Sequence, residues 1–126
     1  MTILAVDYGD RYIGTALAQT SLAEGLMVVN TNEGVVRIVG MCRKYAVEKI
    51  IIGMPVGRLK RNVLSFGKSL GNATGLPVLY WDETLSSKGA QQNLILGNSS
   101  RKRRKEKEHQ VAAALMLQSY LDDQAN

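Results

Sequence analysis

Residues 2–18 read TILAVDYGDRYIGTALA, and the fold can be worked out from this stretch outward. A short apolar run ends at Asp7 and the turn-forming Gly9, and a second run follows over residues 12–18. Apolar runs of this length bounded by turn residues predict strands. Residues 26–31 predict a third strand. Because parallel pairing needs a crossover of about a dozen residues, connections this short predict an antiparallel meander of three strands.

Downstream of the meander, helical and strand patterns alternate. The spacing predicts a helix over 33–45, and three consecutive isoleucines within 49–53 are typical of a strand covered on both faces. The later expected elements are a helix over 62–72, a strand over 77–81, and helices over 84–96 and 106–121. The alternation indicates that the fourth and fifth strands run parallel to the first through right-handed crossovers. The predicted fold is therefore α/β, with a five-stranded mixed sheet flanked by helices.

Composition predicts one domain over residues 1–126, since domains cluster around ~100–150 residues. The apolar fraction of 45% is ordinary for a globular protein. The longest apolar runs, such as 111–117, fall well short of the ~20 residues that a membrane span needs. The start of the chain does not resemble a signal peptide. The single Cys42 allows no internal disulfide, so we expect a cytoplasmic protein without a membrane partner.

The net charge of +5 is concentrated in one place. Residues 101–108 hold six basic and two acidic side chains, which is nearly the whole excess. Such a run is either a solvated helix face or a surface that contacts nucleic-acid phosphates. The candidate phosphate-binding residues are Arg101, Lys102, Arg103, Arg104 and Lys105, together with a second cluster of Arg58, Lys60 and Arg61 in a glycine-bounded loop.

Acidic residues gather where the parallel strands end. Asp7 closes the first strand and Asp82-Glu83 follows the fifth, and ligands of parallel sheets bind at this edge. Each has a plainer interpretation: Asp7 as a turn-forming residue, and Asp82-Glu83 as acids that stabilise a helix N-terminus. Carboxylates brought together from separate segments repel unless a cation lies between them. Oxygen ligands of this kind suit Mg²⁺ or Mn²⁺, ions that can activate water against a phosphodiester.

Four segments together resemble a known family. Residues 7–16, DYGDRYIGTA, are similar to the D-x-G-x-x-x-I-G-x-A opening of the YqgF/RuvX family, relatives of the Holliday-junction resolvase RuvC within the ribonuclease H superfold. Residues 51–55 resemble its I-V-G-L-P strand and loop, residues 81–86 its x-D-E-R-x-S segment, and residues 112–121 its closing helix. The resemblance covers essentially the whole chain in order. It implies a metal-dependent nuclease of ribonuclease H-like fold.

Carried over position by position, the resemblance implies that Asp7 and Glu83 are catalytic metal ligands. The sequence departs from the family pattern at three places. Thr84 stands where the family usually has arginine, and the loop after Pro55 is shorter than usual. His109 occupies the place of the family's aspartate at the start of the last helix.

Three interpretations of His109 remain open. It could be a metal ligand that favours Mn²⁺, a proton donor or acceptor, or a surface residue of a degenerate enzyme. The apolar stripe of the last helix continues backward from Ala113 to His109, so we expect this side chain at the sheet-facing start of that helix. The field of the helix N-terminus disfavours an imidazolium, so we also expect His109 to be neutral. Glu106, on the same helical face, could supply a missing carboxylate.

Two rival functions are weighed against the nuclease. A nucleic-acid-binding module without catalysis would keep the basic run but would have no use for Asp7 and Glu83 together. An ATPase of the actin-like type shares the D-x-G-x-x-x-x-G turn, but this chain shows only one such turn and no second phosphate loop. The expected partner is structured RNA, such as the ends of a ribosomal RNA precursor, or branched DNA. The protein could be a monomer or a homodimer.

Overall fold

A computed structural model describes residues 1–55, 57–82 and 101–125, and within 101–105 it describes the backbone alone. The elements are β1 (Ile3–Tyr8), β2 (Tyr12–Ala18), β3 (Ala23–Asn30), the short 3-10 helix η1 (Thr31–Glu33), α1 (Gly34–Lys44), β4 (Lys49–Met54), α2 (Leu59–Thr74), β5 (Val78–Asp82) and α4 (Arg101–Ala125). Among these residues no helix is both long enough and apolar enough to cross a membrane.

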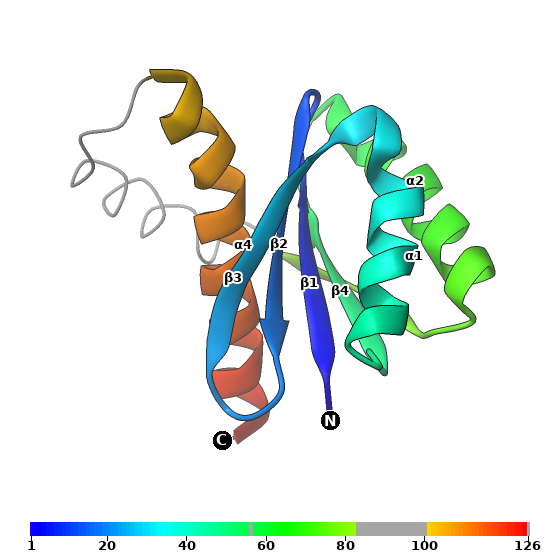
Figure 1. The fold of residues 1–126 in the computed structure, drawn as a ribbon, viewed down its shortest axis with the longest axis vertical. Coiled ribbons are helices and arrows are strands. Elements are labelled where there is room, and N and C mark those ends of the chain that lie inside the picture. The colour runs from blue at the N-terminus through cyan, green and yellow to red at the C-terminus, as the bar shows by residue number, and fades with distance from the viewer. Residues whose placement is uncertain (56, 83–100, 126) are drawn as a thin grey trace.

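The strands form one sheet in the order β3-β2-β1-β4-β5. The first three strands pair antiparallel, whereas β1 with β4 and β4 with β5 pair parallel. This confirms the predicted mixed sheet. Figure 1 shows α1 and α2 together against one face, with α4 lying against the other.

The alternation of side chains along β1 separates two hydrophobic cores. Leu4 and Val6 are fully buried beneath α1 and α2, while Ile3 and Ala5 lie in the core under α4. Because successive side chains of a strand point to opposite faces, Asp7 belongs to the α4 face. The alternation of side chains along β1 thus places Asp7 opposite α4.

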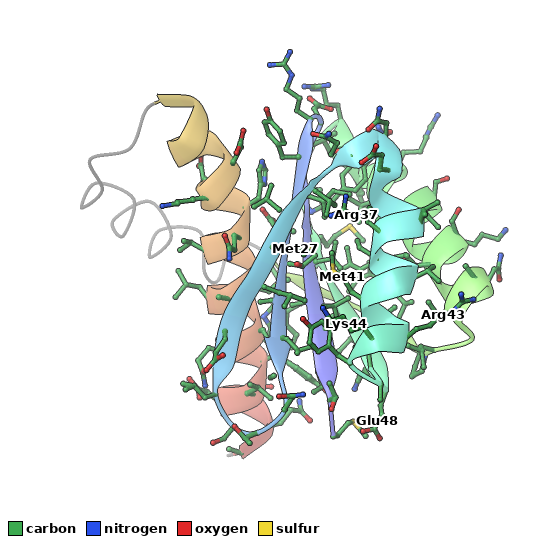
Figure 2. All side chains as sticks on the ribbon, in the orientation of Figure 1. Met27, Arg37, Met41, Arg43, Lys44 and Glu48 are labelled. Atoms are coloured by element: carbon green, nitrogen blue, oxygen red, sulfur yellow. The ribbon has the colours of Figure 1, made fainter. Side chains whose placement is uncertain are left out.

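The α1 helix illustrates how a helix with an apolar stripe covers the first face. Met41 is buried against the sheet, whereas Arg43 and Lys44 are exposed, and Arg43 points away from the sheet (Figure 2). Arg37 donates a hydrogen bond to the Met27 sulfur of β3 at 3.7 Å, which links the helix to the edge of the sheet.

The edge strand β3 begins three residues earlier than predicted, at Ala23 rather than residue 26. Its pairing with β2 shifts register between Gly14 and Ala16, which marks a β-bulge. At the bulge the Thr15 hydroxyl accepts from the Met27 amide at 3.1 Å and donates to the Met27 carbonyl at 2.8 Å. A side chain thus replaces the interrupted backbone pairing, which alternation of apolar residues could not reveal.

The last helix is longer than predicted. It is described from Arg101 onward instead of from residue 106, so the basic run is helical and belongs to the same helix as the apolar stripe. Likewise α2 starts at Leu59 rather than at residue 62. The charged residues lacked the apolar spacing on which the prediction rested, but Lys and Arg are good helix formers. The predicted helix over 84–96 lies outside the described residues.

Candidate active site

Asp7 and His109 meet at the carboxyl end of β1. The His109 Nδ1 atom lies 2.6 Å from Asp7 Oδ2, although 102 positions separate the two residues in sequence. The Asp7 side chain is only 5% exposed and that of His109 28% exposed. Because a carboxylate only accepts hydrogen bonds, His109 Nδ1–H is the donor. The expectation that His109 faces the sheet edge near Asp7 therefore agrees with the geometry.

The second carboxylate oxygen of Asp7 is in an unusual position. Oδ1 is buried, and among the described residues it has no hydrogen-bond partner. Buried polar atoms are nearly always paired, so an unpaired carboxylate oxygen indicates a position suited to a cation. This atom is where a cation would compensate the buried charge.

Two glycines allow α4 to approach the sheet this closely. A Cβ atom placed on Gly9 would lie 2.5 Å from His109 Cε1 and 2.7 Å from its Nε2. A Cβ on Gly14 would lie 2.0 Å from the His109 carbonyl carbon. Neither glycine has a positive φ, so each is needed for space rather than for its backbone conformation. The two glycines of the D-x-G-x-x-x-x-G pattern thus provide the space in which His109 sits.

The helix N-terminus does not act on His109 as expected, and the reason is geometric. Because α4 begins at Arg101, His109 lies in its third turn, where the field of the helix N-terminus has faded. Burial lowers the pKa of His109, but the hydrogen bond to Asp7 and the charges of Asp7 and Glu108 outweigh it, and the pKa is raised above 6.5. The contact with Asp7 therefore favours the imidazolium.

The second acidic segment begins on the far side of β4. Asp82 is the last residue of β5 and pairs in register with Met54 of β4, so two strand spacings, roughly 10 Å, separate the backbones of β1 and β5. Long carboxylate side chains can bridge such a gap toward a shared ion. The predicted ligand Glu83 and its neighbour Thr84 lie outside the described residues.

Glu106 does not complete the site. Among the described residues, no three Asp, Glu, His or Cys side chains lie close enough together to hold a metal ion. Within the described part of the chain, Asp7 and His109 therefore make a pair without a third ligand of these types.

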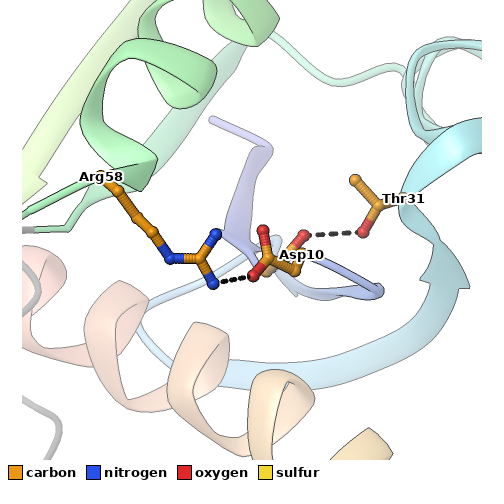
Figure 3. A network of polar contacts seen from close by, with 4 residues as sticks. Asp10, Thr31 and Arg58 are labelled. Carbon is orange, nitrogen blue, oxygen red and sulfur yellow. Dashed lines mark hydrogen bonds and ion pairs between the residues drawn. The ribbon is translucent and has the colours of Figure 1, made fainter.

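The basic cluster after β4 borders an open groove. The groove is lined by Gly57, Asn62, Leu64 and the three basic residues of the cluster, Arg58, Lys60 and Arg61. Arg58 donates from Nη2 to Asp10 Oδ2 in the β1–β2 turn, three residues after Asp7 (Figure 3). Asp10 was not singled out in the sequence, and nothing in the spacing of the charges could have paired it with Arg58. The side chains of residues 101–105 lie outside the described part of the chain.

A five-stranded mixed sheet in this order, with a buried aspartate at the end of the central first strand and a helix residue from the end of the chain against it, defines a ribonuclease H-like protein. Comparison with known proteins gives the family. The model of the RuvX family, described as Holliday junction resolvase, matches residues 1–123, and the chain belongs to that family.

Curated relatives match along nearly their whole length. A protein of Caldanaerobacter subterraneus subsp. tengcongensis, named "Putative pre-16S rRNA nuclease", is 36% identical over all of this chain and 99% of its own. A protein of Halothermothrix orenii with the same name is 37% identical, over 98% of this chain and 96% of its own.

Solved structures support the fold. RuvC of T. thermophilus in complex with a Holliday junction substrate has a TM-score of 0.60 at 15% identity, covering 100% of this chain and 96% of that one. The Fowlpox virus resolvase in complex with Holliday junction DNA has a TM-score of 0.64 at 12% identity and covers both chains completely. At these identities the likeness establishes the ribonuclease H-like architecture.

Proposed function

We propose that this protein is a divalent-metal-dependent nuclease that hydrolyses phosphodiester bonds in structured nucleic acid. The observation that carries the proposal is the buried, unpaired Oδ1 of Asp7 beside His109 at the carboxyl edge of the sheet. A structural aspartate would have both oxygens satisfied. Membership of the RuvX family supports the same activity.

The residues present fit a hard cation. Asp7 through Oδ1 and Glu83 are the proposed ligands, because carboxylate oxygens are what Mg²⁺ and Mn²⁺ prefer. When bound, such an ion polarises the phosphodiester and stabilises the leaving oxygen. The protein itself must keep Asp7 buried, correctly turned and free of competing donors at Oδ1.

His109 is proposed to orient Asp7. Its Nδ1–H occupies Oδ2, which leaves Oδ1 directed at the ion site. Hydrogen bonds of this kind around a ligand fix its direction and tune its affinity. His109 is also proposed to exchange a proton with the scissile phosphate or its water through its second ring nitrogen, Nε2.

The proposed substrate is structured RNA at the ends of a ribosomal RNA precursor, with branched DNA as the second candidate. The names of the curated relatives favour RNA, and the family description favours the junction. We propose that the protein works in the cytoplasm, in agreement with its single buried free thiol. Arg58, Lys60, Arg61 and the basic turns of α4 at Arg101–Lys105 are proposed to contact phosphates.

The test compares cleavage of a labelled pre-16S rRNA end and a four-way DNA junction in Mg²⁺, in Mn²⁺ and in chelator. We expect cleavage by the parent in at least one metal, and loss of at least ~100-fold in Asp7→Asn and Glu83→Gln with unchanged circular dichroism. His109→Ala should lower activity with both ions, because it removes the donor that holds Asp7 Oδ2. If Asp7→Asn cleaved as fast as the parent, the proposed active site would be wrong. If the parent bound the substrates without cleaving them, the protein would be a nucleic-acid-binding module without catalysis.

A further inference from the structure

The ion pair between Asp10 and Arg58 stands out among the described residues. Three ion pairs join described side chains, and one of them, Glu33 with Arg37, spans a single helical turn. The other two are long-range: Asp7 with His109, and Asp10 with Arg58. Both therefore tie distant segments to the carboxyl end of β1 or to the turn that follows it.

The turn that carries Asp10 is tied to the sheet, and Arg58 lies at the start of a helix. The Thr31 hydroxyl donates to the Gly9 carbonyl at 2.8 Å, and the Thr31 amide donates to the Arg11 carbonyl at 3.0 Å, so the turn is tied to the end of β3. Arg58 immediately precedes α2. Figure 3 shows Arg58 reaching from this point across to the turn.

Stability does not account for the pair. The side chains of Arg58 and Asp10 are 80% and 52% exposed, and exposed ion pairs contribute little to folding. What the contact does is restrict a long side chain that would otherwise sample many rotamers. Only Nη2 of Arg58 contacts Asp10, so the highly exposed guanidinium keeps donors for another anion.

The location of the Asp10–Arg58 pair indicates which kind of anion the guanidinium would bind. Asp10 lies three residues beyond Asp7, and Lys60 and Arg61 line the same open groove as Arg58. A polyanion crossing the edge that holds Asp7 would pass these cations. The planar fork of an arginine matches the oxygens of a phosphate diester.

We propose that Asp10 is a positioning residue, which holds the Arg58 guanidinium at the edge of the active site so that it receives a backbone phosphate of the bound nucleic acid. The inference rests on the proposed nuclease function and deepens it. By ordering Arg58 before the substrate arrives, Asp10 reduces the entropy lost on binding.

The sign of one effect separates this role from simple electrostatics. Deleting a carboxylate near a polyanion should tighten binding if Asp10 acts only through its charge. Loss of a positioning residue should weaken binding, and only while Arg58 is present. A double-mutant cycle over Asp10→Ala and Arg58→Ala measures this dependence directly.

The experiment measures the Kd of a fluorescent RNA hairpin and of a four-way DNA junction by anisotropy in chelator, where cleavage cannot interfere. We expect Asp10→Ala to raise Kd by about 2- to 10-fold, and to leave it unchanged or lower it in the Arg58→Ala background. Arg58→Ala should make the slope of log affinity against log salt shallower by about 1 unit. Glu33→Ala is the matched control: it removes one carboxylate from the exposed Glu33–Arg37 pair and should not raise Kd.

Cleavage kinetics give a second readout. Asp10→Ala should raise KM while kcat stays within about twofold, because the proposed contact is made equally in the ground state and the transition state. Equal or tighter binding by Asp10→Ala in the parent background overturns the proposal, and so does an equal loss in both backgrounds. If the parent cleaves and the cycle shows no coupling, only the role of Asp10 fails; if the parent binds with coupling but never cleaves, the nuclease function fails instead.

Discussion

At the scale of single residues, the molecule is organised around one buried carboxylate. Asp7 has one oxygen bound by His109 and the other without a partner among the described residues. Burying a charge is costly unless it is paired, so the contact with His109 supports the folded protein as well as the site. The metal-free protein cannot cleave, so the effect of His109 on folding can be measured there by itself, as a dependence of stability on pH.

His109 should make the stability of the metal-free protein depend on pH. Its pKa is raised in the folded state above the ordinary 6.5, so its contribution is fully present below the unfolded pKa and is lost as the pH rises through the folded pKa. We expect the free energy of unfolding of the parent, relative to His109→Gln, to be larger at pH 5.5 than at pH 8.5, with the decline near and above pH 6.5. Urea unfolding in chelator across this range is the measurement, and a difference that grows with pH would contradict the geometry.

At the scale of elements, the contact of α4 with the sheet depends on glycine. Gly14 faces the backbone of His109 and Gln110, with no flexible side-chain atom between them that could move aside. The helix therefore cannot yield to a new methyl group without shifting as a whole. Since His109 and the buried stripe of α4 belong to the same rigid helix, such a shift would reach both the site and the core.

Gly14→Ala should consequently destabilise the protein by about 2–3 kcal/mol and weaken the contact between Asp7 and His109. Gly40 in α1 offers the matched control, because a Cβ atom there meets nothing within 4 Å. Gly40→Ala should stabilise the protein by about 0.5–1 kcal/mol through the better helix propensity of alanine. Thermal and urea unfolding of the two variants give the comparison, and equal signs for the two substitutions would contradict the packing.

The residue that follows the end of α1 has an unfavourable backbone conformation. Ala46 has a φ of 51°, in the left-handed region. Around it, the Val47 amide donates to the Cys42 carbonyl at 2.9 Å and the Ala46 amide to the Arg43 carbonyl at 3.4 Å, which is a Schellman motif. At the end of α2, Gly75 adopts a φ of 72° without such strain.

Ala46→Gly should therefore stabilise the protein, by about 0.5–1 kcal/mol after the greater freedom of glycine in the unfolded chain is deducted. The converse substitution, Gly75→Ala, should destabilise it by a similar amount. Both lie at helix ends away from the Asp7–His109 pair, so cleavage should not change. A lower midpoint of urea unfolding for Ala46→Gly would show that the strain inferred from φ is absent.

At the scale of the whole molecule, charge is distributed unevenly. Almost all of the net +5 lies in the first turns of α4, on the helix that also carries His109 to the site. Basic side chains on the element that completes the site can guide a polyanion toward it. The charge and the chemistry are thus joined by one helix.

Replacing Arg101, Arg103 and Arg104 with alanine should weaken binding to all nucleic-acid sequences alike, because phosphate contacts carry little sequence information. If all three contact a duplex, the slope of log affinity against log salt should become shallower by roughly 2–3 units. Titrations of RNA and junction DNA between low and moderate salt measure this slope. An unchanged slope would assign the run to a solvated helix face.

The order of the described strands and helices, and the family, could be predicted from the sequence alone. Apolar runs such as Ile50–Ile52 and the spacing of Ala113 and Leu117 are local patterns set by the period of each element, so they are readable without the fold. The extra turns of α4 and the early start of β3 were missed because charged and edge residues lack that period. Proximity of Asp7 to His109 was expected from one helix face.

The contacts that those residues make could be read only from the folded structure. Segments far apart in the chain meet in three contacts: His109 Nδ1 with Asp7, α4 with Gly9 and Gly14, and Arg58 with Asp10. The first of these contacts also raises the pKa of His109. Such contacts are sensitive to shifts of a few tenths of an ångström in the spacing between elements. That spacing is set by how the helix packs on the sheet. A sequence records which groups are present and on which face they lie, whereas protonation and the direction of a side chain depend on what lies opposite them after folding.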